Sequence, residues 1–325
     1  MFYDERNIKY CLLCFDPYEE QEGNSYGENP LPLSGLFNWA NIFKGKRAYP
    51  SCKADYEEFN LIHVNVTTRN LFLIPEILKS KSSDCKLLLN IDFSIDMWKN
   101  SLPLYPELIL SLIDKADYIF AVEPEMANLL SLSLGNRHVA CIPHPVATHL
   151  IENYRVPERI NQIGFSIHRY DDNVLIPAFL ARLLHTFDFQ SIVLGGVHAS
   201  KANIQHLFTF YKETCPFEEL IQTLAPLFAL YETYTIHSYG RLTAECACLG
   251  IPVIGGKYVY SIAKCFPDLA LDKPNDFTNA LSLFSKLSND AQFYKYVSQK
   301  AIDLSKYFSF ANCKKLMLDF LNGDH

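Results

Sequence analysis

The sequence predicts an α/β protein made of two consecutive Rossmann-like domains, each with a parallel sheet. Short, unbroken apolar segments alternate with longer segments whose apolar residues recur at helical spacing. Strands of a parallel sheet that is covered on both faces have this unbroken apolar character. The alternation occurs twice, and a polar stretch with three prolines, 143–158, lies between the two runs. A chain of 325 residues fits two domains of ordinary size better than one.

The first half contains five predicted strands, at 9–15, 59–66, 86–91, 118–122 and 139–142. Helices are expected at 33–43, 68–80, 108–115 and 123–134. The helix at 33–43 belongs to a longer irregular stretch, 16–54, which is rich in Pro, Gly, Asn and Glu. A stretch of this length is expected to be either functional or disordered.

In the second half the pattern restarts, with predicted strands at 160–165, 191–194, 252–255 and 269–271. Helices are expected at 174–185, 203–211, 215–231, 276–287, 290–307 and 308–322. The segment 235–261 combines a polar glycine loop, a short helix, a Gly-Ile-Pro turn, an apolar strand and a second glycine loop. Its helix carries one carboxylate, Glu245, among small residues, and a lone acid on a packed helix needs a partner.

Composition excludes several classes of protein. The formal net charge is −7 and the cations are scattered, so binding to a nucleic-acid backbone is not expected. No apolar run is long enough for a membrane span, and the first residues show no signal peptide. The ten cysteines lie mainly in apolar segments, which favours free thiols in the cytoplasm. The pair Cys11 and Cys14 is more consistent with core packing than with a redox or metal site.

The segment from His237 to Ile254 resembles a motif of the glycosyltransferases with the GT-B architecture. The motif belongs to the large retaining family that includes glycogen, sucrose and mannosyl transferases, and reads E-G-F-G-L-x-x-x-E-A-M-A-x-G-x-P-V-I. The residues that match it in register are Gly240, Glu245, Gly250, Pro252, Val253 and Ile254. Weaker similarities to the family follow in the expected order at 116–122, 142–146, 163–166 and 307–311.

The resemblance implies two Rossmann-like domains that face each other across a cleft. The acceptor-side domain would be 1–150, joined by a C-terminal helix at 308–325 that crosses back, and the donor domain would be 158–307. The implied reaction transfers a sugar from a nucleotide-diphosphate sugar, with UDP or GDP, to an acceptor hydroxyl. Such hexosyltransferases need no metal and no cofactor besides this co-substrate.

The resemblance and the positive end of a helix N-terminus together indicate a diphosphate site in the donor domain. The candidate donor-binding residues are Ser166, Arg169, Gly195, Gly196, Ser238, Tyr239, Gly240, Arg241, Leu242, Thr243 and Glu245. Glu245 takes the place of the family's ribose-binding glutamate; the alternative is a helix acid satisfied by the backbone or an arginine. Arg169 or Arg241 is the candidate for the family's diphosphate cation, with a solvated surface charge as the alternative. Asp171 and Asp172 are expected to be solvent-exposed, and no metal is expected.

His237 is a departure from the family, because the motif has a glutamate there that contacts the donor sugar. A histidine can hydrogen-bond a hydroxyl or a phosphate but supplies no fixed negative charge at neutral pH. We list it as a catalytic candidate, with a loop histidine of no special role as the alternative.

Two further catalytic candidates, Asp92 and Glu123, follow predicted strands of the first half. Asp92 keeps the acid of the family's acceptor-side His-Asp pair, whose histidine is replaced by Ile91. Either acid is a candidate general base if the reaction inverts, and either could instead cap a helix. His63, Asn65 and His144 are candidates for the acceptor side, where the stretch 16–54 is also expected to lie.

Three functions remain open from the sequence. The first is the glycosyltransferase, for which the donor nucleotide, the sugar, the acceptor, the stereochemistry and the oligomeric state are not fixed. A non-catalytic scaffold that still binds nucleotide sugars is the second, because the first motif glutamate and the diphosphate lysine are missing. The third is a nucleotide-sugar epimerase. A DNA-base glucosyltransferase is disfavoured by the acidic composition.

Overall fold

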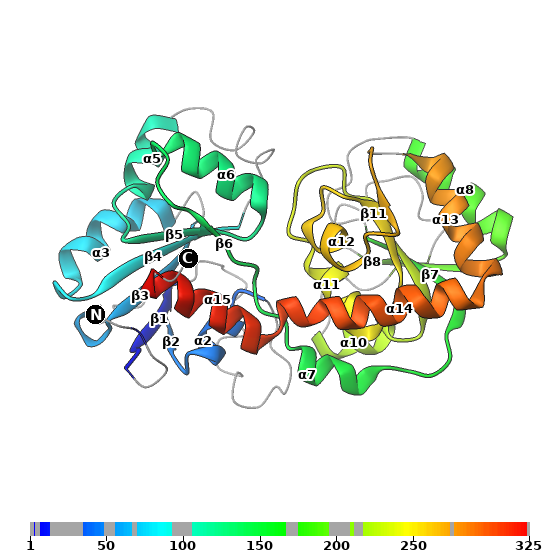
Figure 1. Cartoon of the computed structure of the whole chain (residues 1–325), viewed down its shortest axis with the longest axis horizontal. Helices are drawn as coiled ribbons and strands as arrows, with labels where there is room; N and C mark the ends of the chain where they lie inside the picture. The colour runs from blue at the N-terminus through cyan, green and yellow to red at the C-terminus, as the bar shows by residue number, and fades with distance from the viewer. Residues whose placement is uncertain are drawn as a thin grey trace. The chain divides into compact units, whose positions relative to one another are not determined.

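The computed structural model describes residues 3, 7–13, 35–48, 56–66, 70–92, 106–166, 175–194, 209–210, 217–273 and 276–323. The chain divides into two compact units, the first formed by 1–147 with 308–325 and the second by 148–307. Each unit contains a six-stranded sheet whose strands all pair in parallel (Figure 1). The prediction of an α/β fold with parallel sheets in two domains is therefore confirmed.

The first sheet has the strand order β2-β1-β3-β4-β5-β6. Its strands are β1 (Tyr10–Leu13), β2 (Lys46–Ala48), β3 (Leu61–Val66), β4 (Lys86–Ile91), β5 (Tyr118–Ala121) and β6 (Ala140–Cys141). The helices in the described part of this unit are α2 (Asn38–Ile42), α3 (Ile74–Ser80), α5 (Pro106–Ile113), α6 (Pro124–Ser133) and α15 (Phe310–Asn322). Short 3₁₀ turns lie at Tyr56–Glu58 and Asn70–Leu73.

The two faces of the first sheet differ in chemistry. One face packs its aliphatic side chains against α3, α5 and α6 and forms the main hydrophobic core of the unit (Figure 1). Because side chains alternate along a strand, the residues between these aliphatic positions point to the opposite face. That face carries Tyr10, His63 and Phe120, and the ring of Trp39 on α2 contacts both His63 and Phe120. A polar and aromatic layer therefore lies under α2.

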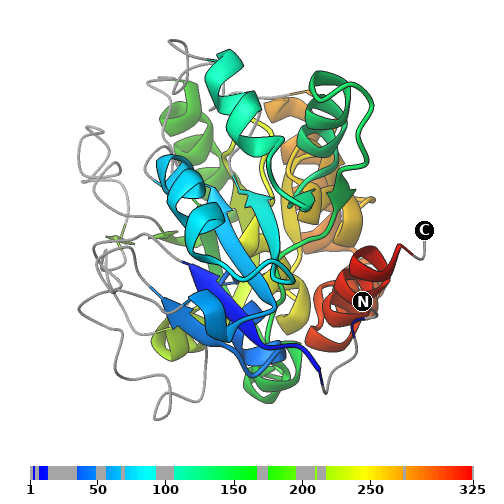
Figure 2. The same cartoon turned by 90° about the vertical axis from the view of Figure 1, so that its left-hand side faces the viewer.

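Helix α15 completes the first unit from the far end of the chain. The backbone of Tyr3 exchanges two hydrogen bonds with the Asn322 side chain, so the first described residue lies beside the end of α15 (Figure 2). The Tyr118 hydroxyl donates to the Leu321 carbonyl at 2.9 Å. At the other end of α15, the Val146 N–H donates to the Phe308 carbonyl at 2.8 Å. These contacts fix both ends of the helix on the first unit.

The second sheet has the strand order β12-β11-β10-β7-β8-β9. Its strands are β7 (Ile160–Ser166), β8 (Gln190–Leu194), β9 (Thr209–Phe210), β10 (Leu227–Glu232), β11 (Val253–Gly256) and β12 (Ala270–Leu271). The helices are α7 (Thr148–Ile151), α8 (Leu175–Phe187), α10 (Phe217–Leu224), α11 (Arg241–Leu249), α12 (Tyr260–Cys265), α13 (Phe277–Asn289) and α14 (Ala291–Ser305), with 3₁₀ turns at Glu152–Tyr154 and Lys306–Phe308. Right-handed crossovers place α8 and α11 on opposite faces, because their connections run in opposite directions along the sheet. Helix α8 contacts α13, whereas α11 contacts α12 and α14.

Two predicted helices of the second half are wrong in part. We predicted one helix over 215–231, but α10 ends at Leu224 and the chain continues as strand β10. Pro226 explains the change, because a proline disfavours the helical conformation of the residue before it and interrupts helical hydrogen bonding. In the predicted helix 203–211, the described residues Thr209–Phe210 form β9 and pair with β8. Residues 203–208 and 211 lie outside the described residues.

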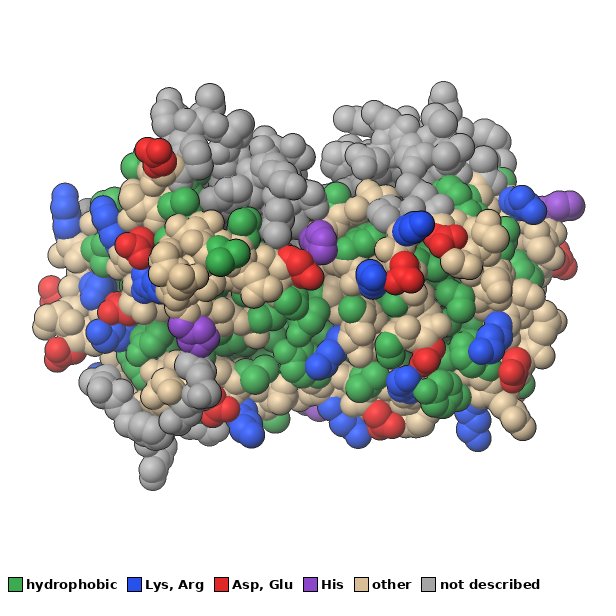
Figure 3. Space-filling view, turned by 45° about the horizontal axis from the view of Figure 1, so that its top comes forward, with side chains coloured by type: hydrophobic (Ala, Val, Ile, Leu, Met, Phe, Trp, Pro, Cys, Tyr) green, Lys and Arg blue, Asp and Glu red, His purple; other side chains and the backbone are tan. Residues whose placement is uncertain are grey.

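The described helices and the face shown in Figure 3 bear on the sequence predictions about membrane spans and charge. Of the helices in the described residues, none combines enough length with enough apolar character to cross a membrane. On the face shown in Figure 3, lysines and arginines are interspersed with acidic side chains and do not gather into a stripe. This agrees with the scattered cations of the sequence.

Candidate functional site

The second sheet reverses its direction of winding between β7 and β10. Strands β8 and β9 lie on one side of this pair, and β11 and β12 lie on the other. In open parallel sheets, ligands bind outside the carboxyl ends of the strands at this point. Ser166 ends β7, Glu232 ends β10, and the two residues are partners in the register of the pair. The loop that follows Glu232 therefore belongs to the candidate site.

Glu232 is a buried carboxyl group at this reversal point, with only 4% of its surface exposed. Its Oε1 accepts a hydrogen bond from the Tyr234 N–H at 3.2 Å. Burial raises the pKa of Glu232 to about 7, although the nearby N–H groups and the Ser166 side chain favour the charged form and offset part of the rise. Glu232 therefore titrates near neutral pH in the folded protein.

The loop after β10 is held by a second loop, the one that follows β11. The Ser238 N–H donates to the Tyr258 carbonyl at 3.3 Å, and the Tyr260 N–H donates back to the Ser238 carbonyl at 2.8 Å. One residue further on, the Ser261 N–H donates to the Tyr239 carbonyl at 3.1 Å. Residues 238–240 thus run parallel to 258–261 as a short extension of the sheet.

Gly240 makes this close pairing possible. Its φ is +75°, in the left-handed region that residues with a Cβ avoid. A Cβ on Gly240 would lie 2.3 Å from Val259 Cγ1 and 2.4 Å from Ser261 Oγ. The Ser261 hydroxyl instead donates to the Gly240 carbonyl at 2.7 Å. A glycine at position 240 is therefore needed both for the left-handed backbone conformation and for the close packing of the turn that begins α11.

Helix α11 begins directly after Gly240, which has no side chain to cap it. The first-turn N–H groups of a helix carry partial positive charge and suit an anionic ligand. Residues 242–249 are all buried, so the helix packs on every side. The side chains of Leu242 and Thr243 are among these buried residues, and Tyr239 is buried beside them. For Leu242 the backbone is the polar group that can face a ligand, whereas Oγ1 of Thr243, like Oε2 of Glu245, has no hydrogen-bond partner among the described residues.

Glu245 lies on the second turn of α11 and is only 2% exposed. Its Oε1 lies 3.2 Å from Nε of Arg241, one turn earlier, whose side chain is 41% exposed. Among the described residues, Oε2 of Glu245 has no hydrogen-bond partner. Burial raises the pKa of Glu245 to about 7, and the Arg241 charge offsets part of the rise. A buried carboxyl oxygen without a partner is costly, so Glu245 is suited to an incoming hydroxyl donor.

The carboxyl-terminal end of α11 is fixed by two arginines that precede β7. The Arg155 Nε donates to the Cys248 carbonyl at 2.7 Å. Arg159 donates to the Leu249 carbonyl at 2.7 Å, and its other amino group donates to the Ala225 carbonyl. Cations at this end of a helix also interact favourably with its dipole. These bonds hold the end of α11 next to the entry of β10.

His237 lies in the loop after β10, with its ring 6.2 Å from the ring of Tyr258 in an edge-on arrangement. The Tyr258 ring covers Gly256, where a Cβ would lie 1.9 Å from Tyr258 Cζ. Burial raises the pKa of Tyr258 to about 12, and the nearby Glu232 adds to the rise. His237 and Tyr258 therefore stand together past the ends of β10 and β11. Of the other predicted donor residues, Arg169, Gly195 and Gly196 lie outside the described residues, as do Asp171 and Asp172.

In the first unit, a chain of hydrogen bonds follows the polar face of the sheet. His63 is fully buried; its Nδ1 pairs with the Tyr10 hydroxyl, and its Nε2 lies 2.7 Å from Oδ1 of Asn90. The Asn90 amide then donates to Oδ1 of Asn65 at 2.8 Å. Burial lowers the pKa of His63 to about 3, so its ring stays neutral at physiological pH. His63 is therefore a buried link to Asn65, which is half-buried at the edge of the sheet.

A second chain involves His144, which is 4% exposed. The Trp39 indole N–H donates to its Nδ1 at 3.2 Å, and its Nε2 lies 3.3 Å from Oδ2 of Asp92. Asp92 follows β4 directly and has a side chain that is 40% exposed. Glu123, the other predicted acid, accepts from the Met126 N–H at 2.9 Å and caps α6. Burial raises the pKa of Glu123 well above its usual range, with Glu125 adding to the rise.

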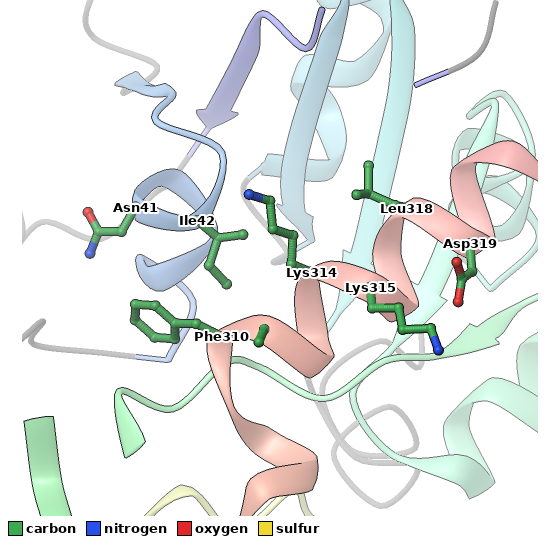
Figure 4. Close-up of a pocket in the computed structure, with 8 residues that line it drawn as sticks. Asn41, Ile42, Phe310, Lys314, Lys315, Leu318 and Asp319 are labelled. Atoms are coloured by element: carbon green, nitrogen blue, oxygen red, sulfur yellow. The ribbon is translucent and has the colours of Figure 1, made fainter. Parts of the chain in front are cut away.

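A separate hollow of about 550 Å³ lies between α2 and α15 (Figure 4). Its walls include Ile42, Phe310 and Leu318, and Lys314, Lys315 and Asp319 also line it. None of the residues selected from the sequence lines this hollow. It therefore adds no residue to the candidate site.

Neither a protein-family model nor a curated protein sequence matches the chain, but solved structures do. Anabaena Alr3699/HepE in complex with UDP has a TM-score of 0.70 at 11% identity, over 97% of this chain and 100% of that chain. An alpha-glucosyltransferase in complex with UDP and a 13-mer DNA has a TM-score of 0.63 at 10% identity, over 97% and 99% of the two chains. Sucrose-phosphate synthase from Thermosynechococcus elongatus has a TM-score of 0.61 at 14% identity, over 82% and 73%.

The chain has the GT-B fold. The structures that it resembles are glycosyltransferases of this fold, and the similarity to HepE covers 97% of the chain. The resemblance found in the sequence is thus confirmed for the fold. At identities of 10% and 14%, the likeness says nothing about the substrate.

Two residues that contact or adjoin the candidate residues were not selected from the sequence. Glu232 ends an apolar run, 227–231, that we assigned to a helix; as the end of a strand it would have pointed to the sheet edge. Trp39 was treated as a packing residue of an irregular stretch, but its indole N–H contacts His144. A lone acid after an apolar run was a usable signal for Glu232, whereas the Trp39 contact joins residues 105 positions apart.

We predict that Gly240→Ala destabilises the protein far more than Gly135→Ala. Both glycines have positive φ, +75° and +68°, but a Cβ at Gly135 meets no atom within 4 Å. Gly135→Ala should therefore cost about 1 kcal/mol for the backbone alone. Gly240→Ala must also displace Val259 and Ser261, which adds the cost of an overpacked core, and we expect a total loss of about 2–4 kcal/mol. Urea denaturation followed by far-ultraviolet circular dichroism, which reports on both units, measures both losses; equal losses would contradict the close packing at Gly240.

We predict that Glu232→Gln stabilises the protein at pH 8 and has little effect at pH 5. The folded pKa is raised from 4.5 to about 7, so folding favours the protonated acid. The stability of the wild type should therefore fall as the pH rises from 4.5 through 7, by up to about 3 kcal/mol for this group. Glutamine keeps the shape without the charge and removes this loss. Thermal denaturation of the wild type and the variant at pH 5 and pH 8 tests this prediction. A Glu232→Gln variant that is less stable than the wild type at pH 8 would mean that a nearby cation compensates the charge of Glu232.

Proposed function

We propose that this protein is a glycosyltransferase that moves a sugar from a nucleoside diphosphate sugar to an acceptor hydroxyl. The observation that carries the proposal is the buried Glu245, whose Oε2 lacks a hydrogen-bond partner among the described residues. It stands one turn into a helix that begins at an uncapped Gly240. The fold supports the same conclusion, because similar structures were solved with UDP and glucose or with UDP-glucose.

In this proposal the donor binds outside the carboxyl ends of β7 and β10. The N–H groups at the start of α11 hold the diphosphate, and the half-exposed Arg241 supplies a positive charge without a metal. Glu245 accepts hydrogen bonds from the ribose hydroxyls. The same N–H groups stabilise the charge that develops on the leaving diphosphate, which is the main demand of the reaction.

His237 takes the place of a glutamate in this mechanism. Its ring, held against Tyr258, hydrogen-bonds a hydroxyl of the donor sugar or a phosphate oxygen. If the reaction inverts the anomeric centre, Asp92 is the exposed acid in the first unit that can accept the acceptor's proton. If it retains, no protein base is required. The net charge of −7 favours a carbohydrate or another small hydroxyl acceptor over DNA.

The test is binding of UDP-glucose and GDP-glucose by isothermal titration calorimetry. We predict that Glu245→Gln weakens the binding of the preferred donor by about 10- to 100-fold, the size of lost hydrogen bonds to a charged group. Glu219→Gln is the matched control, because Glu219 is an exposed acid on α10 of the same unit. If neither donor binds the wild type, or if Glu245→Gln binds as the wild type does, the assignment fails.

The same variant gives a pH signature. The raised pKa of Glu245, about 7, means that the group is largely protonated at pH 6 and ionised at pH 8. Two ribose hydroxyls donate best to the ionised carboxylate, so binding should release a proton and tighten from pH 6 to pH 8. Glu245→Gln should lose this dependence. UDP-glucose suits the measurement because its diphosphate does not titrate in this range.

The alternative of a binding protein without turnover is favoured by His237 in place of the motif glutamate. Hydrolysis of the bound donor distinguishes the two functions, because a transferase slowly transfers its sugar to water in the absence of an acceptor. Donor binding without any hydrolysis would support the binding protein.

A further inference from the structure

Two chains of polar contacts in the first unit share one order of groups; the first is joined by hydrogen bonds throughout, and the second ends in a close contact between His144 and Asp92. Each begins at a buried aromatic donor, passes through a buried histidine and reaches a polar side chain at the carboxyl edge of the sheet. The first runs from Tyr10 through His63 and Asn90 to Asn65. The second runs from Trp39 through His144 to Asp92. The direction of each chain determines what its last residue can offer to a ligand.

In the first chain, the amide of Asn90 sets the direction. Its nitrogen donates to Asn65 Oδ1 at 2.8 Å, and its oxygen faces His63 Nε2 at 2.7 Å and must accept. His63 Nε2 therefore carries the proton, and Nδ1 accepts from the Tyr10 hydroxyl. Because the Asn65 oxygen is used inside the chain, its amide N–H groups are the part left for the edge of the sheet. The first chain thus ends on a donor.

In the second chain, Trp39 sets the direction, because an indole N–H can only donate. His144 Nδ1 must accept it, so the neutral ring carries its proton on Nε2, which faces Asp92 Oδ2 at 3.3 Å. The lone pair of Nδ1 is then occupied by the Trp39 N–H, and Nε2 already carries a proton. His144 cannot serve as the general base, and the second chain ends on the Asp92 carboxylate, which is an acceptor.

Residues at and before α2 also hold the backbone of the segment that carries His144. Asn38 donates from its side chain to the Pro145 carbonyl at 2.8 Å. Gly35 packs so closely that a Cβ there would lie 2.9 Å from His144 Cβ. Gly35 precedes α2 and Asn38 belongs to it, and α2 also carries Trp39. One short helix therefore positions the backbone and the side chain of the segment next to Asp92.

The two chain ends lie on the same face of the sheet. Asn65 and Asn90 are register partners on β3 and β4, and Asp92 follows Asn90 by two residues, which returns its side chain to that face. A hydroxyl group both donates and accepts a hydrogen bond. The amide of Asn65 and the carboxylate of Asp92 therefore match the two needs of one hydroxyl, or of adjacent hydroxyls on a sugar.

We infer that Asn65 and Asp92 bind the hydroxyl groups of the acceptor, and that Trp39 and His144 are positioning residues that orient Asp92. The inference rests on the proposed function, for which it names the acceptor contacts. Asn65 and Asp92 would touch the acceptor. Trp39, His144, Tyr10 and His63 would act through them.

The first experiment tests the positioning without any ligand. Nitrogen NMR of the histidine side chains reports which ring nitrogen carries the proton, and His144→Gln identifies the His144 signal. We predict the Nε2-protonated form alone in the wild type and a mixture of both forms in Trp39→Phe. Tyr10→Phe is the matched control, which should change His63 and leave His144 as it is. An unchanged His144 in Trp39→Phe would overturn the positioning role.

The second experiment uses glucose as the probe for the acceptor site. Titration of the wild type with glucose should shift the side-chain amide signal of Asn65, and Asp92→Asn should weaken this binding at least 10-fold. Trp39→Phe should weaken it less, and none of these variants should alter the affinity for UDP-glucose. No shift at Asn65 in the wild type, or equal glucose binding by Asp92→Asn, would overturn the assignment.

These outcomes separate the two proposals. If UDP-glucose and GDP-glucose do not bind but glucose shifts Asn65, the proposed transferase fails while the hydroxyl site stands. If a donor binds and is hydrolysed but glucose has no effect on Asn65, the hydroxyl site fails while the proposed transferase stands.

Discussion

The candidate donor site depends on one contact, the pairing of residues 238–240 with residues 258–261. This pairing extends the second sheet beyond its strands and sets where α11 begins. It is possible because Gly240 has no side chain between the two segments. Helix α11 follows this pairing and is buried, and Oε2 of Glu245 on it has no hydrogen-bond partner among the described residues. The absence of a Cβ at Gly240 therefore links the path of the backbone to the position of Glu245.

Burial of carboxyl groups at strand and helix ends recurs in both units. Burial raises the pKa of Glu123, Glu232 and Glu245, so each favours the protonated form more than a solvated acid does. Such groups lower stability near neutral pH, and a fold has little reason to retain them for packing alone. Perturbed acids concentrate at functional sites, which fits the position of Glu232 and Glu245 at the winding reversal of the second sheet.

The sequence predicted the parallel sheets because most strands are short apolar runs bounded by turns. It failed at β10, since Leu224, Leu227 and Phe228 keep helical spacing across the break at Pro226. Glu245 and Gly240 were found through a local motif, which needs no knowledge of distant contacts. The roles of His63 and His144 were not readable, because they depend on Tyr10 and Trp39, far away in the chain. Local pattern therefore reveals elements and loops, whereas hydrogen-bond direction requires the assembled sheet.

The two arginines before β7 have a consequence for how the site responds to change. Arg159 bonds to carbonyls at the entry of β10 and at the end of α11, so one planar group links both ends of the segment that carries the site. Substitution of Arg159 would remove both bonds and release the end of α11, the helix that carries Glu245, from the entry of β10. Ligand affinity can therefore drift through substitutions that touch no ligand, and natural or engineered variation before β7 offers a gradual way to tune the site.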